Sequence, residues 1–418
     1  MTTSNTNRID AEFCIVGAGP AGLTLALLLL RSGASVALVE RSRSFVREFR
    51  GEILQPGGLA VLDEIGVLDR VIGTGAHRLS GFRMTAEGRT MMEVDYRRVP
   101  GPYKYLLSIP QQQLLQELLT QCRRYEEFAY IDGSHPDELR TDTGRITGIQ
   151  VGGAAGSLEV RTPCVIGADG RHSKIRRLAA IEYDRSDISG HDLLWFRIPA
   201  TEAEPDTVRI INSAGSAVVI HRSYPNMVQI GWAMPRGQYR EFAVQGPAEI
   251  RRRVARALPG YADAIDAEIT DLGRMTLLDV FAGRARQWVA DGIVLVGDAA
   301  HTHGPLGAQG INLALQDAAV LHPILLEARR RNDFGAGTLS AFPARRTPEV
   351  DRIMRFQGVQ SRTMFSQGRL AATVRAGVLG LIRRTPVFPR ISHRIAYGDP
   401  DIHVRTDLFT ADRRNPCA

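Results

Sequence analysis

The hydrophobic positions near the N-terminus form two short strand-like runs with a helical segment between them. Strands are predicted at residues 12–16 and 35–39, whose interior positions are apolar without interruption, as in strands buried on both faces. A helix is predicted from about Pro20 to Arg31, with Gly33 ending it. Two later apolar runs, 164–167 and 292–296, are also followed by glycine-containing loops and helical segments. The pattern therefore favours an α/β fold with a parallel sheet.

A different pattern, alternation of apolar and polar residues, occupies residues 77–105 and 182–284. The first stretch indicates a β-hairpin, and the second contains the runs DLLWFRIPA, VRIINS, SAVVIHRSY and MVQIGWAMP. Period-two alternation is typical of antiparallel sheets with one covered face. It places Trp195 and Arg197 on one face of their strand, and Trp232 and Met234 together on one face of another. We therefore expect an antiparallel sheet inserted into the α/β fold.

Helical patterns dominate after Gly310. Amphipathic helices are predicted over 343–367 and 369–386, and the second could touch a membrane, but its apolar stretch is short. The apolar run 23–30 is also far shorter than the roughly 20 residues that a membrane span needs. The N-terminal residues lack the apolar core of a signal peptide. Stable membrane insertion is therefore not expected.

Composition adds a basic but scattered charge. The 418 residues carry 52 lysines and arginines against 45 acidic residues, a net charge of +7, and only Lys104 and Lys174 are lysines. Because the arginines are interspersed with acidic residues, nucleic-acid binding is not expected. Four cysteines without a CxxC spacing are typical of reduced thiols in a cytoplasmic protein. No carboxylate or cysteine cluster accompanies His301 and His303, so no metal site is predicted.

The loop after the first predicted strand carries a G-x-G-x-x-G motif at Gly17, Gly19 and Gly22. The first glycine permits a tight turn, the second lets a pyrophosphate approach the backbone, and the third lets the helix pack on the strand. Glu40 ends the second strand, 18 residues past Gly22, where an acid accepts hydrogen bonds from ribose hydroxyls. This combination predicts dinucleotide binding and argues against a 2′-phosphate, but it leaves NAD and FAD both open.

Two later segments narrow the choice. CVIGADGRHSKIRR (164–177) ends a strand in Ala168-Asp169-Gly170, and GIVLVGDAAHTHGPLGAQGIN (292–312) ends another in Gly297-Asp298. Together with the first glycine motif they resemble, over roughly residues 10–330, the class A FAD-dependent aromatic hydroxylases of the para-hydroxybenzoate hydroxylase type. The resemblance implies a Rossmann-type FAD-binding domain with an inserted antiparallel-sheet substrate domain and C-terminal helices. It implies a monooxygenase that hydroxylates an aromatic or polyketide-like small molecule with NADH or NADPH and O₂, through a flavin C4a-hydroperoxide.

The same resemblance assigns roles to individual residues. Asp298 is expected to bind the ribityl chain, Pro305 to lie near the flavin carbon that takes up oxygen, and Asp169 to serve both flavin and NAD(P)H. Arg50 is expected either near the cofactor or in solvent, and Gln111 stands where many relatives have an arginine. The expected cofactor-binding residues are Gly17, Gly19, Pro20, Ala21, Gly22, Glu40, Arg41, Arg50, Gln111, Asp169, Asp298, Gly307, Gln309, Gly310, Ile311 and Asn312.

Domain boundaries and substrate contacts complete this interpretation. Residues 1–76, 106–181 and 284–358 are assigned to a split FAD-binding domain, 77–105 and 182–283 to the substrate sheet, and 359–418 to a C-terminal helical segment. Trp232, Met234 and His221 are candidate substrate contacts, with core packing as the alternative for Trp232. His221 and Tyr224 are also candidate bases for a phenol, the alternative being solvated residues in or beside a turn.

Three other functions use related features. A flavin-dependent halogenase would need a W-x-W-x-I-P motif and a lysine, whereas WFRIP (195–199) has one tryptophan and neither lysine lies in a matching motif. An FAD-linked dehydrogenase or reductase is the next alternative, and a flavin-binding protein without activity is the third. The sequence leaves both the choice of NADH or NADPH and the oligomeric state, monomer or dimer, open.

Overall fold

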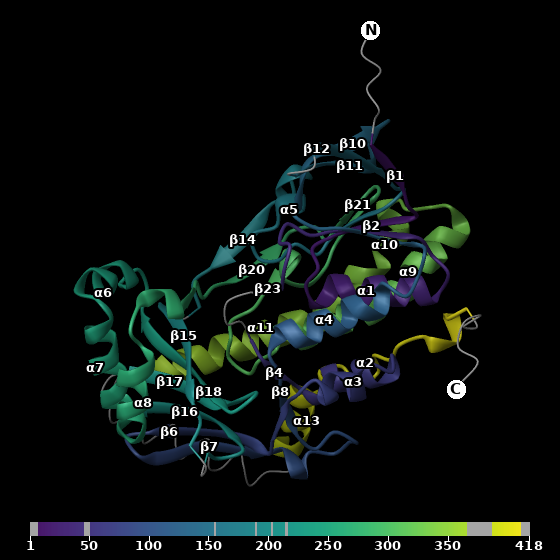
Figure 1. Cartoon of the computed structure of the whole chain (residues 1–418). Helices are drawn as coiled ribbons and strands as arrows, with labels where there is room; N and C mark the ends of the chain where they lie inside the picture. Colours follow the sequence, from purple (N-terminus) through teal and green to yellow (C-terminus); the bar gives the residue numbers. More distant parts are fainter. Residues whose placement is uncertain are drawn as a thin grey trace.

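The computed structural model describes residues 7–45, 51–153, 156–188, 190–201, 204–213, 216–365 and 387–410. Figure 1 shows a parallel sheet with its helices on one side of the molecule and a larger antiparallel sheet on the other. Shorter sheets join the two. The expected α/β fold with an inserted antiparallel sheet is therefore confirmed.

A six-stranded sheet forms the first half. Its strands are β2 (Phe13–Val16), β3 (Val36–Val39), β9 (Phe128–Ile131), β13 (Val165–Gly167), β21 (Val289–Ala290) and β22 (Ile293–Leu295). Their order is β21-β22-β13-β2-β3-β9, and all but β21 run parallel. Helix α1 (Pro20–Arg31) packs against α4 (Gln111–Cys122) and α9 (Gly310–Arg331). The predicted strands and the helix between them are confirmed to within a residue.

Three small sheets surround this core. The first sheet contains β1 (Arg8–Asp10), β10 (Ser134–Asp142), β11 (Arg145–Gly153) and β12 (Gly156–Arg161). The second sheet contains β4 (Ile53–Leu54), β5 (His77–Leu79) and β8 (Leu106–Ser108). The third sheet contains β14 (Tyr183–Ser186), β20 (Ala282–Ala285) and β23 (His301–Thr302). Short helices lie at α2 (Pro56–Glu64), α3 (Leu68–Gly73) and α5 (Lys174–Leu178). Strands on both sides of the expected domain boundaries pair in the second and third sheets, so these sheets tie the two halves together.

The second half is a seven-stranded sheet with the predicted alternation. Its strands are β6 (Gly81–Ala86), β7 (Arg89–Asp95), β15 (His191–Pro199), β16 (Thr207–Ser213), β17 (Ser216–Ser223), β18 (Met227–Pro235) and β19 (Thr276–Leu278). Their order is β19-β15-β18-β17-β16-β6-β7, with β6 and β7 forming the expected hairpin. Every pairing is antiparallel except β16 with β6.

One face of this sheet is covered by helices that the alternation pattern did not predict. They are α6 (Tyr239–Gln245), α7 (Pro247–Ala257) and α8 (Ala262–Glu268), and Figure 1 shows them on the outer side of the sheet. The signal was available in PAEIRRRVARA, where Ile250, Val254 and Ala257 recur at helical spacing behind a proline start. These residues pack on Phe196, Ile230 and their neighbours in a separate core cluster.

The C-terminal part is helical, as expected. Its helices are α10 (Ala336–Leu339), α11 (Ala341–Phe365) and α13 (Val387–Tyr397). Single turns of 3-10 helix lie at η1 (Tyr96–Arg98), η2 (Pro259–Tyr261), η3 (Leu272–Arg274), η4 (Gly297–Ala299) and η5 (Thr406–Leu408). The helix predicted over 369–386 lies outside the described residues. Within the described ranges, a search for helices of the length and apolar character needed to cross a membrane finds none.

Candidate cofactor and substrate site

The predicted motif residues meet at one edge of the parallel sheet. Asp298 follows β22, Asp169 follows β13, Gly17 follows β2 and Glu40 follows β3. These four strands are adjacent and parallel, so their carboxyl ends lie side by side in the same order. With about 4.8 Å between strands, the row extends over roughly 14 Å. The chain thus presents an elongated site where strand connections diverge, the place at which open α/β sheets bind dinucleotides.

The three glycines of the first motif have distinct surroundings. Gly17 has φ +109°, and a Cβ there would lie 2.4 Å from the carbonyl oxygen of Ala168 in the neighbouring motif. A Cβ on Gly22 would lie 2.0 Å from the Gly17 oxygen, so this glycine lets α1 approach the loop. A Cβ on Gly19 would meet nothing within 4 Å. Two glycines are therefore required by the protein's own packing, while Gly19 borders open space at the helix N-terminus.

Glu40 is buried behind this loop, and only 5% of the residue is exposed. Its carboxylate accepts hydrogen bonds from Ala18 N at 2.8 Å and from Ser42 N at 3.0 Å. The acid thus links the glycine loop to the end of β3 and places negative charge beside the sheet edge. Arg41 next to it is exposed, and Gln111 lies half-buried at the first position of α4. Arg50 lies outside the described residues.

The carboxylate of Asp169 also accepts hydrogen bonds from nearby residues of its own segment. Its carboxylate accepts from Ser173 Oγ at 2.5 Å, Lys174 N at 2.6 Å and Ile175 N at 3.0 Å. Burial raises the pKa of this carboxyl, although these donors partly oppose that shift. The acid therefore fixes the turn between β13 and α5, and through that turn it sets the surface on which Gly17 rests.

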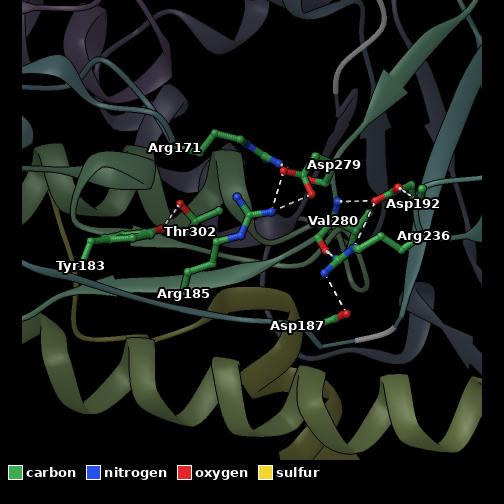
Figure 2. Close-up of polar contacts among 10 residues, drawn as sticks. Arg171, Tyr183, Arg185, Asp187, Asp192, Arg236, Asp279, Val280 and Thr302 are labelled. Atoms are coloured by element: carbon green, nitrogen blue, oxygen red, sulfur yellow. Dashed lines mark hydrogen bonds and ion pairs between the residues drawn. The ribbon is translucent and has the colours of Figure 1, made fainter. Parts of the chain in front are cut away.

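Asp298 lies in the loop after β22 with 28% of its side chain exposed, and its Oδ2 is 3.4 Å from Arg171 Nη2. Arg171 also donates to the carbonyl oxygen of Asp279 at 3.0 Å, and Arg185 donates to the Asp279 carboxylate at 2.7 and 3.0 Å. Figure 2 shows these two arginines converging on Asp279. Asp298 therefore keeps access to solvent while an arginine from the second motif stands beside it.

The segment of Asp279 and Val280, which precedes β20, is also held to the antiparallel sheet. Asp192 accepts a bond from Val280 N at 3.4 Å, and Arg236 donates to the Val280 carbonyl and pairs with Asp187 at 2.8 Å (Figure 2). These contacts connect β15 and β18 with the strand β20 that leads back to the parallel sheet. They hold the two halves in a fixed relation across the site.

The loop of residues 304–309, which precedes α9, is held by amide side chains from three directions. Gln357 Nε2 donates to the carbonyls of Gly304 at 3.0 Å and Leu306 at 2.7 Å, and Gln55 Nε2 donates to Gly307 O at 2.8 Å. Gln309 Nε2 donates to Ile395 O at 2.8 Å. The side chains of Pro305 and Leu306 are half-buried. The loop therefore has one defined shape, although its contacts come from distant helices.

Asn312 completes this arrangement in the first turn of α9. Its Oδ1 accepts from Gln55 N at 2.8 Å and its Nδ2 donates to Ala308 O at 2.7 Å. The side chains of Gln309 and Asn312 thus serve the loop itself. A ligand can instead be met by the backbone N–H groups of Gln309, Gly310, Ile311 and Asn312 at the start of α9. This helix N-terminus favours negative charge.

A buried polar network behind the loop was not predicted. His303 Nε2 lies 2.9 Å from His301 Nδ1, His301 Nε2 lies 2.7 Å from Asp317 Oδ2, and Arg346 Nε donates to Asp317 Oδ1 at 2.7 Å. Asp317 also accepts from Gly297 N at 2.9 Å. Burial opposes ionisation of Asp317, but His301 and Arg346 outweigh it and hold the pKa of the carboxyl well below its usual value. Both histidines therefore serve this network, and among the described residues no cluster with metal-ligand composition is found.

The sheet residues expected to contact substrate divide between its two faces. Trp232 and Met234 lie in the cluster under α6, α7 and α8, so packing accounts for both and we do not assign them to the site. His221 lies on the opposite face, and it is a buried strand residue, not the solvated one considered above. Burial lowers the pKa of its imidazole to about 4. Tyr224 lies in the turn that follows β17.

The face that carries His221 looks toward the 304–309 loop. Leu306 packs against the hydrophobic cluster that contains Trp195 and Val280, and Ala308 and Val219 both pack against the neighbouring cluster that contains Val208. Residues of the antiparallel sheet and of the loop thus bound the same region. The open space at Gly19, the partly exposed Asp298 and the α9 N-terminus fit an extended cofactor such as FAD along the sheet edge, with its ring end toward the sheet.

Comparison with known proteins agrees with this geometry. The sequence pattern of the FAD binding domain family matches residues 10–357. The chain is 50% identical over 398 residues to 6-methylpretetramide 4-monooxygenase of Streptomyces rimosus, and the match spans 95% of each chain. PqsL of Pseudomonas aeruginosa in complex with 2-aminobenzoylacetate shares the fold with a TM-score of 0.77 at 24% identity, covering 89% of this chain and 100% of that one.

A second solved structure, p-nitrophenol 4-monooxygenase PnpA of Pseudomonas putida DLL-E4, has a TM-score of 0.77 at 17% identity and covers 94% of this chain and 100% of its own. At such identities the structures report a common fold. The family pattern and the Streptomyces relative are stronger evidence of family membership, because these matches cover the sheet edge, the 304–309 loop and the antiparallel sheet together. The chain therefore belongs to the class A FAD-dependent aromatic hydroxylases and is an FAD-dependent monooxygenase.

Proposed function

We propose that this enzyme hydroxylates 6-methylpretetramide, or an aromatic polyketide closely similar to it, in secondary metabolism. The observation that carries the proposal is the 50% identity with 6-methylpretetramide 4-monooxygenase over 95% of the chain. NADH or NADPH is the proposed electron donor, and the cytoplasm is the proposed location. The bound flavin supplies the redox chemistry: it accepts electrons from the nicotinamide and activates O₂ for transfer to the ring.

In this proposal the chain's residues bind, orient and shield. Glu40 holds the adenosine ribose, the N-terminus of α1 faces the pyrophosphate, and Asp298 holds the ribityl hydroxyls. With FAD bound, the N–H groups at the start of α9 would favour the negative charge that a reduced flavin carries. Pro305 and the clamped 304–309 loop exclude water from the reacting face. His221, uncharged and buried on the substrate face, is proposed as a neutral hydrogen-bonding partner of a substrate hydroxyl, because burial lowers the pKa of its imidazole to about 4 and leaves it too weak a base to take a phenolic proton.

The activity is tested with purified enzyme, FAD, NADH or NADPH, and 6-methylpretetramide under ¹⁸O₂. We expect substrate-stimulated NAD(P)H oxidation and a product that is heavier by one labelled oxygen atom. Oxidation that no substrate stimulates, or a product without label, would contradict the proposal. Incorporation of halide, or turnover without O₂, would indicate instead the halogenase or dehydrogenase alternatives.

The proposed cofactor position is tested with a matched pair of glycine variants. Gly19→Ala adds a methyl group where the protein has no atom within 4 Å, so the fold should persist while FAD binding weakens. Gly22→Ala places its Cβ 2.0 Å from the Gly17 oxygen, so it should lower the melting temperature of the apoprotein. Unchanged FAD affinity in Gly19→Ala would place the pyrophosphate elsewhere.

A further inference from the structure

The face of the antiparallel sheet that looks toward the 304–309 loop carries one row of three polar side chains beside an apolar row. In the strand register Arg197 of β15 stands opposite Gln229 of β18, and Gln229 stands opposite His221 of β17. Among the described residues of β15, β16, β17 and β18, Arg197 is the only lysine, arginine, aspartate or glutamate on this face. Three polar side chains therefore form a continuous line across three strands.

The neighbouring row is apolar and close to the loop. It contains Trp195, Gly231 and Val219 in direct cross-strand register. A Cβ on Gly231 would lie 2.6 Å from the Trp195 ring, so the glycine makes room for the indole to lie across β18. Trp195 belongs to the hydrophobic cluster against which Leu306 of the loop packs. Two residues along a strand are about 7 Å apart, so a substrate of several rings on this surface reaches the polar row.

A buried acid from the other half of the chain completes the polar row. Glu52, which precedes β4 and is 2% exposed, forms an ion pair with Arg197, whose side chain is 22% exposed. Ser223 Oγ donates to Glu52 at 2.7 Å, and Gln229, with its amide nitrogen toward the acid, donates at 2.6 and 3.0 Å. Gln55, three residues beyond Glu52, holds Gly307 of the loop. One short segment thus connects the polar row to the loop.

The charges in this row determine which ligand it suits. Glu52 and Arg197 sum to zero, and burial lowers the pKa of His221 to about 4, so that imidazole adds no charge at neutral pH. An entering carboxylate would lose its hydration while the attraction of Arg197 was cancelled by Glu52. An uncharged carboxamide keeps both an acceptor for the guanidinium and donors for neighbouring oxygens.

We propose that the Arg197–Glu52–Gln229 row is the subsite that receives an uncharged hydrogen-bonding end of the aromatic substrate, a carboxamide in preference to a carboxylate. The inference rests on the proposed function, because it concerns the substrate of the same site. Arg197 contacts the substrate. Glu52 and Gln229 are positioning residues: Glu52 holds the guanidinium and neutralises its charge, and Gln229 holds Glu52.

The sheet contains a matched control on its opposite face. Arg209 of β16 pairs with Glu204, and their side-chain exposures of 19% and 1% nearly equal the 22% and 2% of Arg197 and Glu52. Arg209 stands opposite Ile220, whose side chain packs under α7 and α8, so this second ion pair faces away from the loop. Loss of Glu204 therefore perturbs a similar ion pair without touching the proposed subsite.

The test measures binding of 3-hydroxy-2-naphthamide and 3-hydroxy-2-naphthoate to the FAD-loaded enzyme from the change in flavin absorbance. We expect the parent to prefer the amide. Glu52→Gln leaves Arg197 unneutralised and should shift the ratio of affinities toward the carboxylate by about tenfold or more. Arg197→Gln should shift it the other way, and Glu204→Gln should leave it unchanged. A general folding defect would weaken both probes alike, so the ratio isolates the charge effect.

The outcomes distinguish the two proposals. Ratios within threefold of the parent in both Glu52→Gln and Arg197→Gln, or an equal shift in Glu204→Gln, would overturn the subsite while the proposed hydroxylation stood. Failure of 6-methylpretetramide to stimulate NAD(P)H oxidation, together with failure of both probes to perturb the flavin of the parent, would overturn both proposals. If Glu52→Gln does not retain FAD, the ratio of affinities in Arg197→Gln tests the subsite alone. A shift toward the amide supports the subsite, and a ratio within threefold of the parent overturns it.

Discussion

Replacing Asp317 by asparagine should weaken the fold and FAD binding together. This fully buried carboxylate accepts bonds from Arg346 Nε at 2.7 Å and Gly297 N at 2.9 Å, and it lies 2.7 Å from His301 Nε2. Arg346 is itself 0% exposed, so no water can take the place of the lost charge. Removing one partner of a buried ion pair costs about 3–5 kcal/mol. Because an amide still accepts one hydrogen bond, we expect the lower end, about 3 kcal/mol.

The effect on FAD follows from geometry. Gly297 precedes Asp298, and its N–H is fixed by Asp317, so the carboxylate proposed to hold the ribityl chain loses its support in the variant. Urea unfolding of apo and FAD-loaded protein at pH 7 measures the first effect, and the FAD content after gel filtration measures the second. Glu327→Gln is the control, because Glu327 lies on the same helix but pairs at the surface with Arg330 and Arg331. It should change neither quantity.

The pH dependence gives an independent measurement. The pKa of Asp317 is lowered in the folded state, so its stabilisation is complete above the pKa of an unfolded aspartate, about 3.9, and is lost as the pH falls toward the folded value. The stability difference between parent and Asp317→Asn should therefore be full at pH 7 and shrink below about pH 4. A difference under 1 kcal/mol at pH 7 with full FAD content would refute this account of the network.

Three other substitutions address the cofactor site directly. Glu40→Ala should reduce FAD affinity tens-fold, since hydrogen bonds to a charged group contribute roughly 1.5–3 kcal/mol, and it should also lower the stability of the apoprotein, because Ala18 N and Ser42 N lose their acceptor. Equal FAD affinity by fluorescence titration would move the adenosine away from β3. Asp298→Ala should lose FAD during purification; full retention would remove the ribityl role from this acid. Pro305→Gly should keep FAD but release more hydrogen peroxide for each NAD(P)H consumed, because a looser loop shields the reacting face less well. An unchanged ratio of product to NAD(P)H in that variant would show that the loop does not enclose the ring.

The parallel half was predictable because its constraints are local. Gly17 and Gly22 are required by contacts in and beside one strand–loop–helix unit, so their spacing alone predicts the turn and the packing of the helix on the loop. The strand ends that carry Asp169 and Asp298 are similarly marked by apolar runs that stop at glycine. What spacing could not give was how Gln309 and Asn312 are used, since their side-chain partners include residues far along the chain.

The antiparallel half shows what the alternation pattern alone cannot predict. Alternation correctly separated Trp195 and Arg197 from Phe196 and Ile198, but it cannot say which face meets helices and which meets the loop. That choice is made by α6 to α8, which follow the last of the alternating runs and pack against the face that contains Trp232 and Met234. The Asp317 network was missed for a related reason. His301 and Arg346 are 16 and 29 residues away from Asp317, and only tertiary packing brings them together.

The two halves of the site differ in how they can change. The cofactor edge consists of strand ends whose glycines and acids also hold the backbone: Glu40 joins two loops and Asp169 fixes a turn, so substitutions there disturb folding and binding together. The substrate face is built from alternate side chains of each strand, such as Trp195 and Arg197 of β15, whereas the opposite face forms a separate core under α6, α7 and α8. Residues such as Val219 can therefore vary with little effect on that core, whereas Arg197 is tied to the buried Glu52. Substrate range should follow from a few positions on this face, while the flavin site keeps its geometry.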